Sequence, residues 1–231
     1  MCEGIFRPLA HPLVLLLVRL RVPPPLVVAA AGAAGITAAV ELGRGSLLVA
    51  ALLVQLKTLL DNADGQLARL TGRMSTFGRY LDSEVDLLVN AALFAALGWT
   101  TGRPALALAG FLALTAVLSL NFNAERLARR AVAEPEAEGR ATALLRRFYG
   151  LVYAPQDRLA EALVARRPAL TGSVSVSLLA NLGMSTQLGA FGLLMALGHP
   201  LAFAWLALTQ VAAIVLAFLP RRLPRQQEEV A

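Results

Sequence analysis

Acidic residues are concentrated in one short stretch of this chain, where five of the 15 fall between positions 61 and 86. Asp61 and Asp64 are three residues apart, so they lie on one face of a helix. Asp82 and Asp86 are four residues apart and share a face in the same way. Residues 70–77 contain glycine and hydroxyl residues that can turn the chain. Two antiparallel helices would then oppose these faces and bring four carboxylates together.

Four carboxylates in one poorly hydrated place cannot all stay ionised, because each negative charge disfavours the next. A divalent cation removes this conflict. Oxygen ligands select hard ions such as Mg²⁺, Mn²⁺ or Ca²⁺ over Zn²⁺ or Cu²⁺. The single cysteine, Cys2, and the two histidines lie outside the acidic stretch. The stretch therefore predicts a metal site made of oxygen ligands.

Small residues share the helix faces that carry the acids. Gly65 and Ala68 follow Asp64 on the first face, and Gly78 precedes Asp82 on the second. They remove bulk from the faces that carry the acids, which would let a ligand approach the backbone closely.

With Arg69, these positions spell D-x2-D-G-x2-A-R-x8-G-x3-D-x3-D. The pattern resembles the signature of the class I CDP-alcohol phosphatidyltransferases, and all eight fixed positions match at the right spacing. The resemblance implies a transferase of phospholipid biosynthesis, of the EC 2.7.8 type. In that reaction an acceptor hydroxyl attacks the phosphate of a CDP-linked donor, and CMP is released.

The resemblance also implies roles for individual residues and a homodimer. Asp61, Asp64 and Asp82 would ligate a pair of Mg²⁺ or Mn²⁺ ions. Asp86 would lie near the second ion and act as the general base. The cytidine and diphosphate of the donor would be held by Asp61, Gly65, Ala68, Arg69 and Gly78.

The sequence leaves the acceptor open. Family members that use glycerophosphate commonly have Lys after the last motif aspartate, and the inositol phosphate branch often has Arg, whereas this chain has Leu87. We expect CDP-diacylglycerol as donor and a small alcohol or polyol phosphate as acceptor. The alternative is transfer of a soluble CDP-alcohol head group to a lipid alcohol. The candidate acceptor-binding residues are Lys57, Asn121, Arg126, Arg129 and Arg130, of which Lys57 has the simpler alternative role of neutralising Asp61 one turn away.

The elements that position these residues are predicted from composition. The chain has 231 residues, 57% of them hydrophobic and only 16% charged, whereas about a quarter of a soluble domain is charged. A bilayer core needs about 20 mostly apolar residues per helix. We therefore predict an all-α integral membrane protein with six transmembrane helices and an N-terminal amphipathic helix in the membrane interface. The predicted spans are about 25–42, 46–63, 80–97, 105–120, 174–197 and 201–219, and residues 6–20 are the interfacial helix or, alternatively, a seventh span.

The predicted organisation has three parts. Residues 1–22 form the juxtamembrane helix, 23–220 the catalytic transmembrane domain, and 221–231 a cytoplasmic tail. Within the second part, a helical segment at about 123–170 lies in the cytoplasm. With the N-terminus inside, 18 of the 21 Lys and Arg residues are cytoplasmic, as the positive-inside rule requires. The acidic stretch then faces the cytoplasm of a bacterial or archaeal-type cell membrane.

The net charge of +6 indicates lipid head groups and phosphates as binding partners rather than nucleic acid, because the chain is so hydrophobic. A transporter would also carry acids within the membrane, but it would spread them along a path, whereas these lie at one end. A non-catalytic scaffold explains the spans and not the motif. Tyr149 and Tyr153 are interpreted as interfacial anchors.

Overall fold

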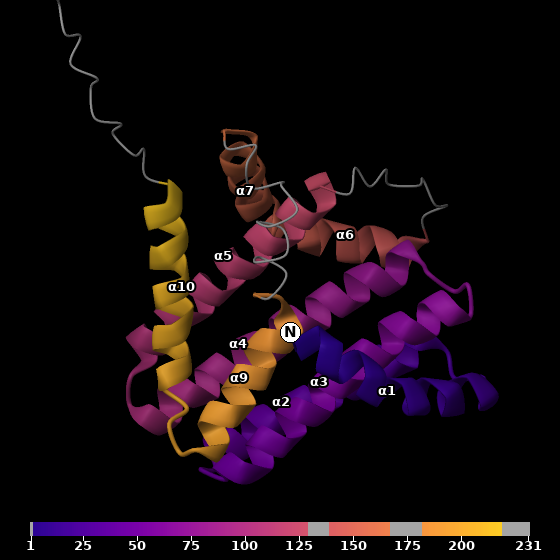
Figure 1. Ribbon diagram of the computed structural model, residues 1–231, viewed down its shortest axis with the longest axis horizontal. Coiled ribbons are helices and arrows are strands. Elements are labelled where there is room, and N and C mark those ends of the chain that lie inside the picture. Colours follow the sequence, from indigo (N-terminus) through magenta and orange to yellow (C-terminus); the bar gives the residue numbers. More distant parts are fainter. Residues whose placement is uncertain (1, 129–138, 167–181, 219–231) are drawn as a thin grey trace, which may run out of the picture.

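The computed structural model describes residues 2–128, 139–166 and 182–218, and the regular elements in these ranges are all helices (Figure 1). This confirms the all-α prediction for the described part of the chain. The first five helices are α1 (Cys2–Arg19), α2 (Pro24–Gly43), α3 (Leu47–Leu70), α4 (Thr76–Thr101) and α5 (Pro104–Ala128). They are followed by α6 (Arg140–Val152), α7 (Ala154–Arg166), α9 (Met184–Ala196) and α10 (Ala202–Phe218).

Two of the described helices contain stretches long and apolar enough to cross a bilayer, Pro24–Gly43 and Pro104–Ala124. The α9 and α10 helices are apolar but shorter, and the predicted fifth span begins at 174, outside the described residues. The α3 and α4 helices are longer, but the acidic stretch lies within them, and neither is among the helices apolar enough to cross a bilayer by length and composition. The composition is thus that of a membrane protein, and the count of six spans stays a prediction.

Helix α2 packs against both α3 and α4, and two glycines set its distance from α4. A Cβ atom on Gly32 would lie 2.7 Å from Val85 Cγ1, and one on Gly35 would lie 2.5 Å from Val89 Cγ1. Both distances are too short for any side chain, so only glycine permits this approach. Because Val85 directly precedes Asp86, the contact helps to fix the position of that carboxylate.

A short turn at 71–75 connects α3 to α4, within the segment that the sequence predicted. Gly72 adopts a φ of 63°, and the amide of Arg73 donates to the carbonyl of Ala68 at 2.9 Å, which is the usual way to end a helix. The hydroxyl of Ser75 then accepts from the amide of Gly78 at 3.0 Å and caps the start of α4. The turn therefore reverses the chain between the two halves of the motif.

The apolar core lies beyond the acidic stretch along α4 and is built around four aromatic rings from four helices. Phe191 and Phe203 stack with ring centroids 4.4 Å apart, and Phe94 lies 6.0 Å from Phe111. Figure 1 shows α1, in indigo, beside α3, where Val14 of α1 belongs to a second apolar cluster. Helix α3, which carries the first half of the motif, packs against α1, α2 and α9.

Candidate active site

One cavity of about 450 Å³ is lined by all eight residues of the motif. The five from α3 lie on one of its walls and the three from α4 on another. The structure thus brings together the two helix faces that the sequence predicted to oppose each other. These residues are Asp61, Asp64, Gly65, Ala68 and Arg69 on α3, and Gly78, Asp82 and Asp86 on α4.

Three carboxylates form the centre of the site. One oxygen each from Asp61, Asp82 and Asp86 can be chosen so that all lie within 4.8 Å of one another. Asp64 lines the same cavity, and its Oδ1 accepts from the backbone amide of Gly65. A site of carboxylate oxygens alone is suited to a hard divalent cation, so these residues fit the predicted Mg²⁺ or Mn²⁺.

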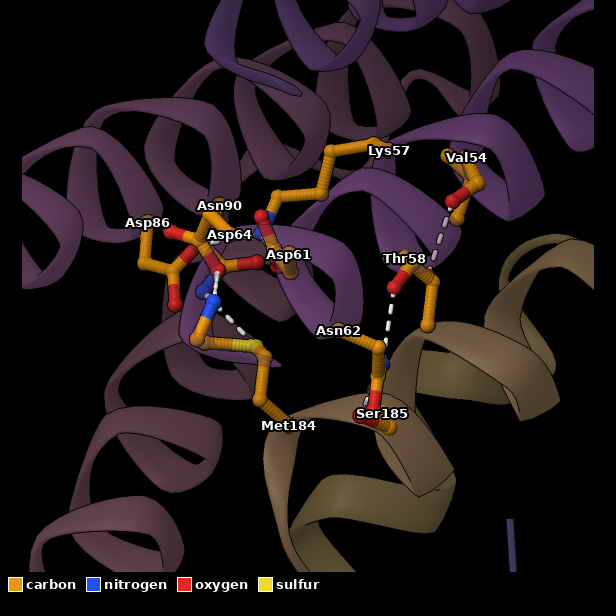
Figure 2. A network of polar contacts seen from close by, with 11 residues as sticks. Val54, Lys57, Thr58, Asp61, Asn62, Asp64, Asp86, Asn90, Met184 and Ser185 are labelled. Atoms are coloured by element: carbon orange, nitrogen blue, oxygen red, sulfur yellow. Dashed lines mark hydrogen bonds and ion pairs between the residues drawn. The ribbon is translucent and has the colours of Figure 1, made fainter. Parts of the chain in front are cut away.

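Lys57 is the only lysine of the chain, and it is 1% exposed. Its Nζ donates to Asp61 on α3 and to Asp86 on α4. Figure 2 shows the side chain extending toward these two carboxylates. Lys57 is absent from the described lining of the cavity. The geometry therefore favours its simpler role, the neutralisation of nearby acids, over the predicted contact with the acceptor.

The start of α9 closes the site between α3 and α4, which the sequence did not predict. On α3, Asn62 Nδ2 donates to Ser185 Oγ at 3.0 Å, and on α4, Asn90 Nδ2 donates to Met184 Sδ at 3.7 Å (Figure 2). Met184 and Ser185 also line the cavity. The available signal was Asn90, which stands among apolar residues of α4, because an amide in such a place needs a partner.

Four arginines line the same cavity as the acidic centre. Arg69 is part of the motif, and three further arginines line the same cavity without having been predicted. A planar guanidinium matches the oxygens of a phosphate group, so this lining suits a diphosphate. The four residues are Arg7, Arg69, Arg73 and Arg79.

A second cavity of about 270 Å³ adjoins the first, and Asp86 and Met184 line both. Its other described lining residues come from α4, α5, α6 and α7 and from the chain beside them. Among the predicted acceptor residues, Asn121 lines this cavity. The side chain of Arg126, and all of Arg129 and Arg130, lie outside the described part of the structure.

Tyr149 and Tyr153 also line the second cavity. Their rings stack with centroids 4.8 Å apart, and their hydroxyls donate to Asp157 Oδ2 at 3.1 Å and to the carbonyl of Ser83 at 3.3 Å. Burial, followed by the nearby carboxylate of Asp86, raises the pKa of Tyr153, so its hydroxyl stays a donor. The structure thus gives both tyrosines hydrogen-bond partners within the fold, and their interfacial role stays a prediction.

A family model for the CDP-alcohol phosphatidyltransferases matches residues 9–216. The bifunctional IPC transferase and DIPP synthase of Thermococcus kodakarensis is 37% identical over 82 residues, which are 35% of this chain and 19% of that protein. The phosphatidylinositol phosphate synthase of Corynebacterium glutamicum is 34% identical over 92 residues, 39% of this chain and 42% of that protein. The aligned segment thus spans less than half the length of each curated relative.

Among solved structures, one match is the crystal structure of Mycobacterium tuberculosis phosphatidylinositol phosphate synthase with CDP-DAG bound. It matches with a TM-score of 0.43 and 20% sequence identity. The match covers 87% of this chain and 94% of that one.

Proposed function

Because the chain belongs to the CDP-alcohol phosphatidyltransferase family, we propose that it transfers the phosphatidyl group of CDP-diacylglycerol to the hydroxyl of a small alcohol. CMP is the second product. The observation that carries this proposal is the convergence of all eight motif residues on one cavity. The name of the Corynebacterium relative, a phosphatidylinositol phosphate synthase, supports a phosphatidyl lipid as the product.

In this proposal the enzyme spans a cell membrane six times, with α1 in the interface and the acidic end of the bundle at the cytoplasmic surface. Such a site lies where a lipid and a water-soluble molecule can meet. The lopsided distribution of arginine supports the orientation. We also expect a homodimer, on family resemblance alone.

The first cavity binds the donor in the proposed complex. The four arginines of its lining hold the diphosphate. Gly65, Ala68 and Gly78 leave room for the cytidine, and a Cβ on Gly65 would meet nothing closer than the Arg69 guanidinium at 3.5 Å. Asp61, Asp64, Asp82 and Asp86 would hold a pair of Mg²⁺ or Mn²⁺ ions, which neutralise the diphosphate and the charge that develops on the leaving phosphate.

Asp86 is the general base of the proposed reaction, and its place at the border of both cavities supports this role. Its carboxylate accepts the proton of the acceptor hydroxyl as the hydroxyl oxygen bonds to the lipid-linked phosphorus. The bond from this phosphorus to the bridging oxygen breaks, and CMP leaves with that oxygen. Lys57 holds the Asp86 carboxylate by donating to its Oδ1.

The variant Asp86→Asn tests this assignment. We expect it to reduce CMP release from CDP-diacylglycerol at least about a hundredfold, the lower range of general base catalysis, while the protein stays folded. Glu41→Gln is a matched control, because Glu41 pairs with Arg44 at the end of α2 and lines neither described cavity. Retained turnover in Asp86→Asn would exclude Asp86 as the base.

Exhaustive chelation tests the metal requirement with the same assay. We expect activity to disappear and to return with Mg²⁺ or Mn²⁺, and unchanged activity would contradict the metal prediction.

The reversed arrangement of substrates is tested by replacing the donor and the acceptor. It would be favoured if the protein released CMP from a soluble CDP-alcohol, with a lipid alcohol as acceptor, and released none from CDP-diacylglycerol.

A further inference from the structure

The two cavities that meet at Asp86 differ in the charge of their linings. The first combines its acids with four arginines. Among the described residues that line the second, the charged groups are the carboxylates of Asp86 and Asp157. The other described groups there are hydroxyls, amides, aromatic rings and apolar side chains. An anionic ligand therefore fits the first cavity better than the second.

Asp157, in the first turn of α7, is the centre of a hydrogen-bond network in the second cavity. Its Oδ1 accepts from Ser119 Oγ at 2.8 Å and from Asn123 Nδ2 at 2.7 Å, and its Oδ2 accepts from the Tyr149 hydroxyl at 3.1 Å. A carboxylate has about four acceptor sites, so these three donors leave about one for a ligand. The donors orient Asp157 and stabilise its negative charge without neutralising it.

Asn121 supplies a second acceptor in the same cavity. Its Oδ1 is buried and has no hydrogen-bond partner. A buried acceptor without a partner is costly, and a donor on a ligand would remove that cost. Asp157 and Asn121 therefore both favour a ligand that donates hydrogen bonds.

We propose that the second cavity binds the acceptor alcohol and selects one that carries hydrogen-bond donors, hydroxyl or ammonium, and no phosphate. This inference rests on the proposed function, because the cavity receives its role from the reaction at Asp86. The reacting hydroxyl lies at Asp86 and gives its proton to that carboxylate, while the remaining donors reach Asp157 and Asn121. A phosphate in their place would set like charges and acceptor groups against one another.

Matched alcohols with and without a phosphate test this selection. The purified full-length protein is given CDP-diacylglycerol, Mg²⁺ or Mn²⁺, and one acceptor at a time, and CMP release is measured. The pairs are inositol with inositol 1-phosphate and glycerol with glycerol 3-phosphate, and serine and ethanolamine are added as amino alcohols. We expect at least about tenfold higher kcat/KM for acceptors without phosphate, which corresponds to about 1.4 kcal/mol.

A preference for the phosphorylated member of a pair would overturn the inference and leave the proposed function standing. If none of these acceptors supports CMP release, the proposed function is rejected, and the inference with it. The two failures are therefore distinguishable in one experiment.

The variant Asp157→Asn separates recognition from a structural role. We expect it to raise KM for the acceptor about tenfold or more, with KM for CDP-diacylglycerol unchanged, because one charged hydrogen bond is lost. The fold should tolerate the change, since the Oδ1 of the new Asn can still accept from Ser119 and Asn123, and its Nδ2 can donate to the Tyr149 hydroxyl oxygen. Equal changes in both KM values, or none, would overturn the role of Asp157.

Asn121→Ala is the second test, and it leaves the donors to Asp157 in place. It too should raise KM for the acceptor alone. Glu41→Gln again serves as the carboxyl-to-amide control, with both KM values expected to stay unchanged.

Discussion

At the scale of single residues, Lys57 explains how acidic groups from two helices can face each other. Its ammonium contacts Asp61 and Asp86 at once, and their side chains are only 16% and 15% exposed. A lysine suits this place because a compact charge on a flexible stem fits between two carboxylates, whereas a planar guanidinium needs more room. The charge of the site is thus balanced in part by the protein itself.

Replacing this lysine should make the fold depend more strongly on metal. In Lys57→Met the two carboxylates lose their shared cation, so we expect the metal-free protein to lose about 3 kcal/mol of stability, the cost typical of breaking a buried ion pair. Mg²⁺ should then raise the Tm of the variant more than that of the unaltered protein, because bound ligand stabilises the folded state. Thermal unfolding in detergent, with EDTA or with Mg²⁺, measures both effects, and equal Mg²⁺-induced shifts would contradict this role.

At the scale of helices, the close contact of α2 with α4 sets the width of the site. Gly32 and Gly35 allow α2 to approach Val85 and Val89, and α3 packs on the same helix α2. The two halves of the motif are therefore held relative to each other partly through a helix that carries none of its residues. A substitution at this contact in α2 should therefore disturb the site although the substituted residue does not line the cavity.

The variant Gly35→Ala tests this contact. Its new methyl group would lie 2.5 Å from Val89 Cγ1, so we expect a loss of about 1–3 kcal/mol in stability, typical of overpacking. Val89→Ala in the same chain should recover part of the loss, and a double-mutant cycle measures the coupling. Gly43→Ala is the control, because its Cβ would meet only Ala96 Cβ at 4.0 Å. Purely additive effects of Gly35→Ala and Val89→Ala would contradict direct contact.

The motif could be placed on opposed helix faces from the sequence because its spacing is local and helical periodicity alone determines which residues share a face. The turn at Gly72 was also predictable from local sequence, because glycine and hydroxyl residues are typical of turns. The roles of α9, and of Asp157 with Ser119 and Asn123, were not predictable, because they arise from contacts between residues more than 30 positions apart in the sequence. Asp157 lies in a polar helix, and the pattern of polar and apolar residues in that helix is the one expected of a solvent-exposed helix.

At the scale of the whole molecule, the distribution of charge predicts the orientation in the membrane. Arg44 and Arg103 are the two arginines expected outside, in the turns that follow α2 and α4. The long polar segment that includes α6 and α7 is expected inside, together with the acidic end of the bundle. The six-span arrangement requires the turns at Arg44 and Arg103 to lie on the same side.

Cysteine labelling can test this topology directly, because Cys2 is the only cysteine. In a Cys2→Ser background, a membrane-impermeant maleimide should label Arg44→Cys and Arg103→Cys in intact cells. Arg140→Cys, at the exposed start of α6, should react only after the membrane is permeabilised. Labelling of Arg44→Cys and Arg103→Cys from opposite sides would contradict six spans.

The two cavities share Asp86 and Met184 in their linings. Apart from α4, which lines both, the remaining residues of the two linings come from different parts of the chain. The first cavity takes its other lining residues from the first four helices, their connections and Ser185, whereas most of the second comes from residues 115–157. Under the proposed function, mutation and selection in α5 to α7 could therefore exchange one head group for another while the donor site and the reaction were preserved. Lipid diversity would then arise by changing one segment of a shared enzyme.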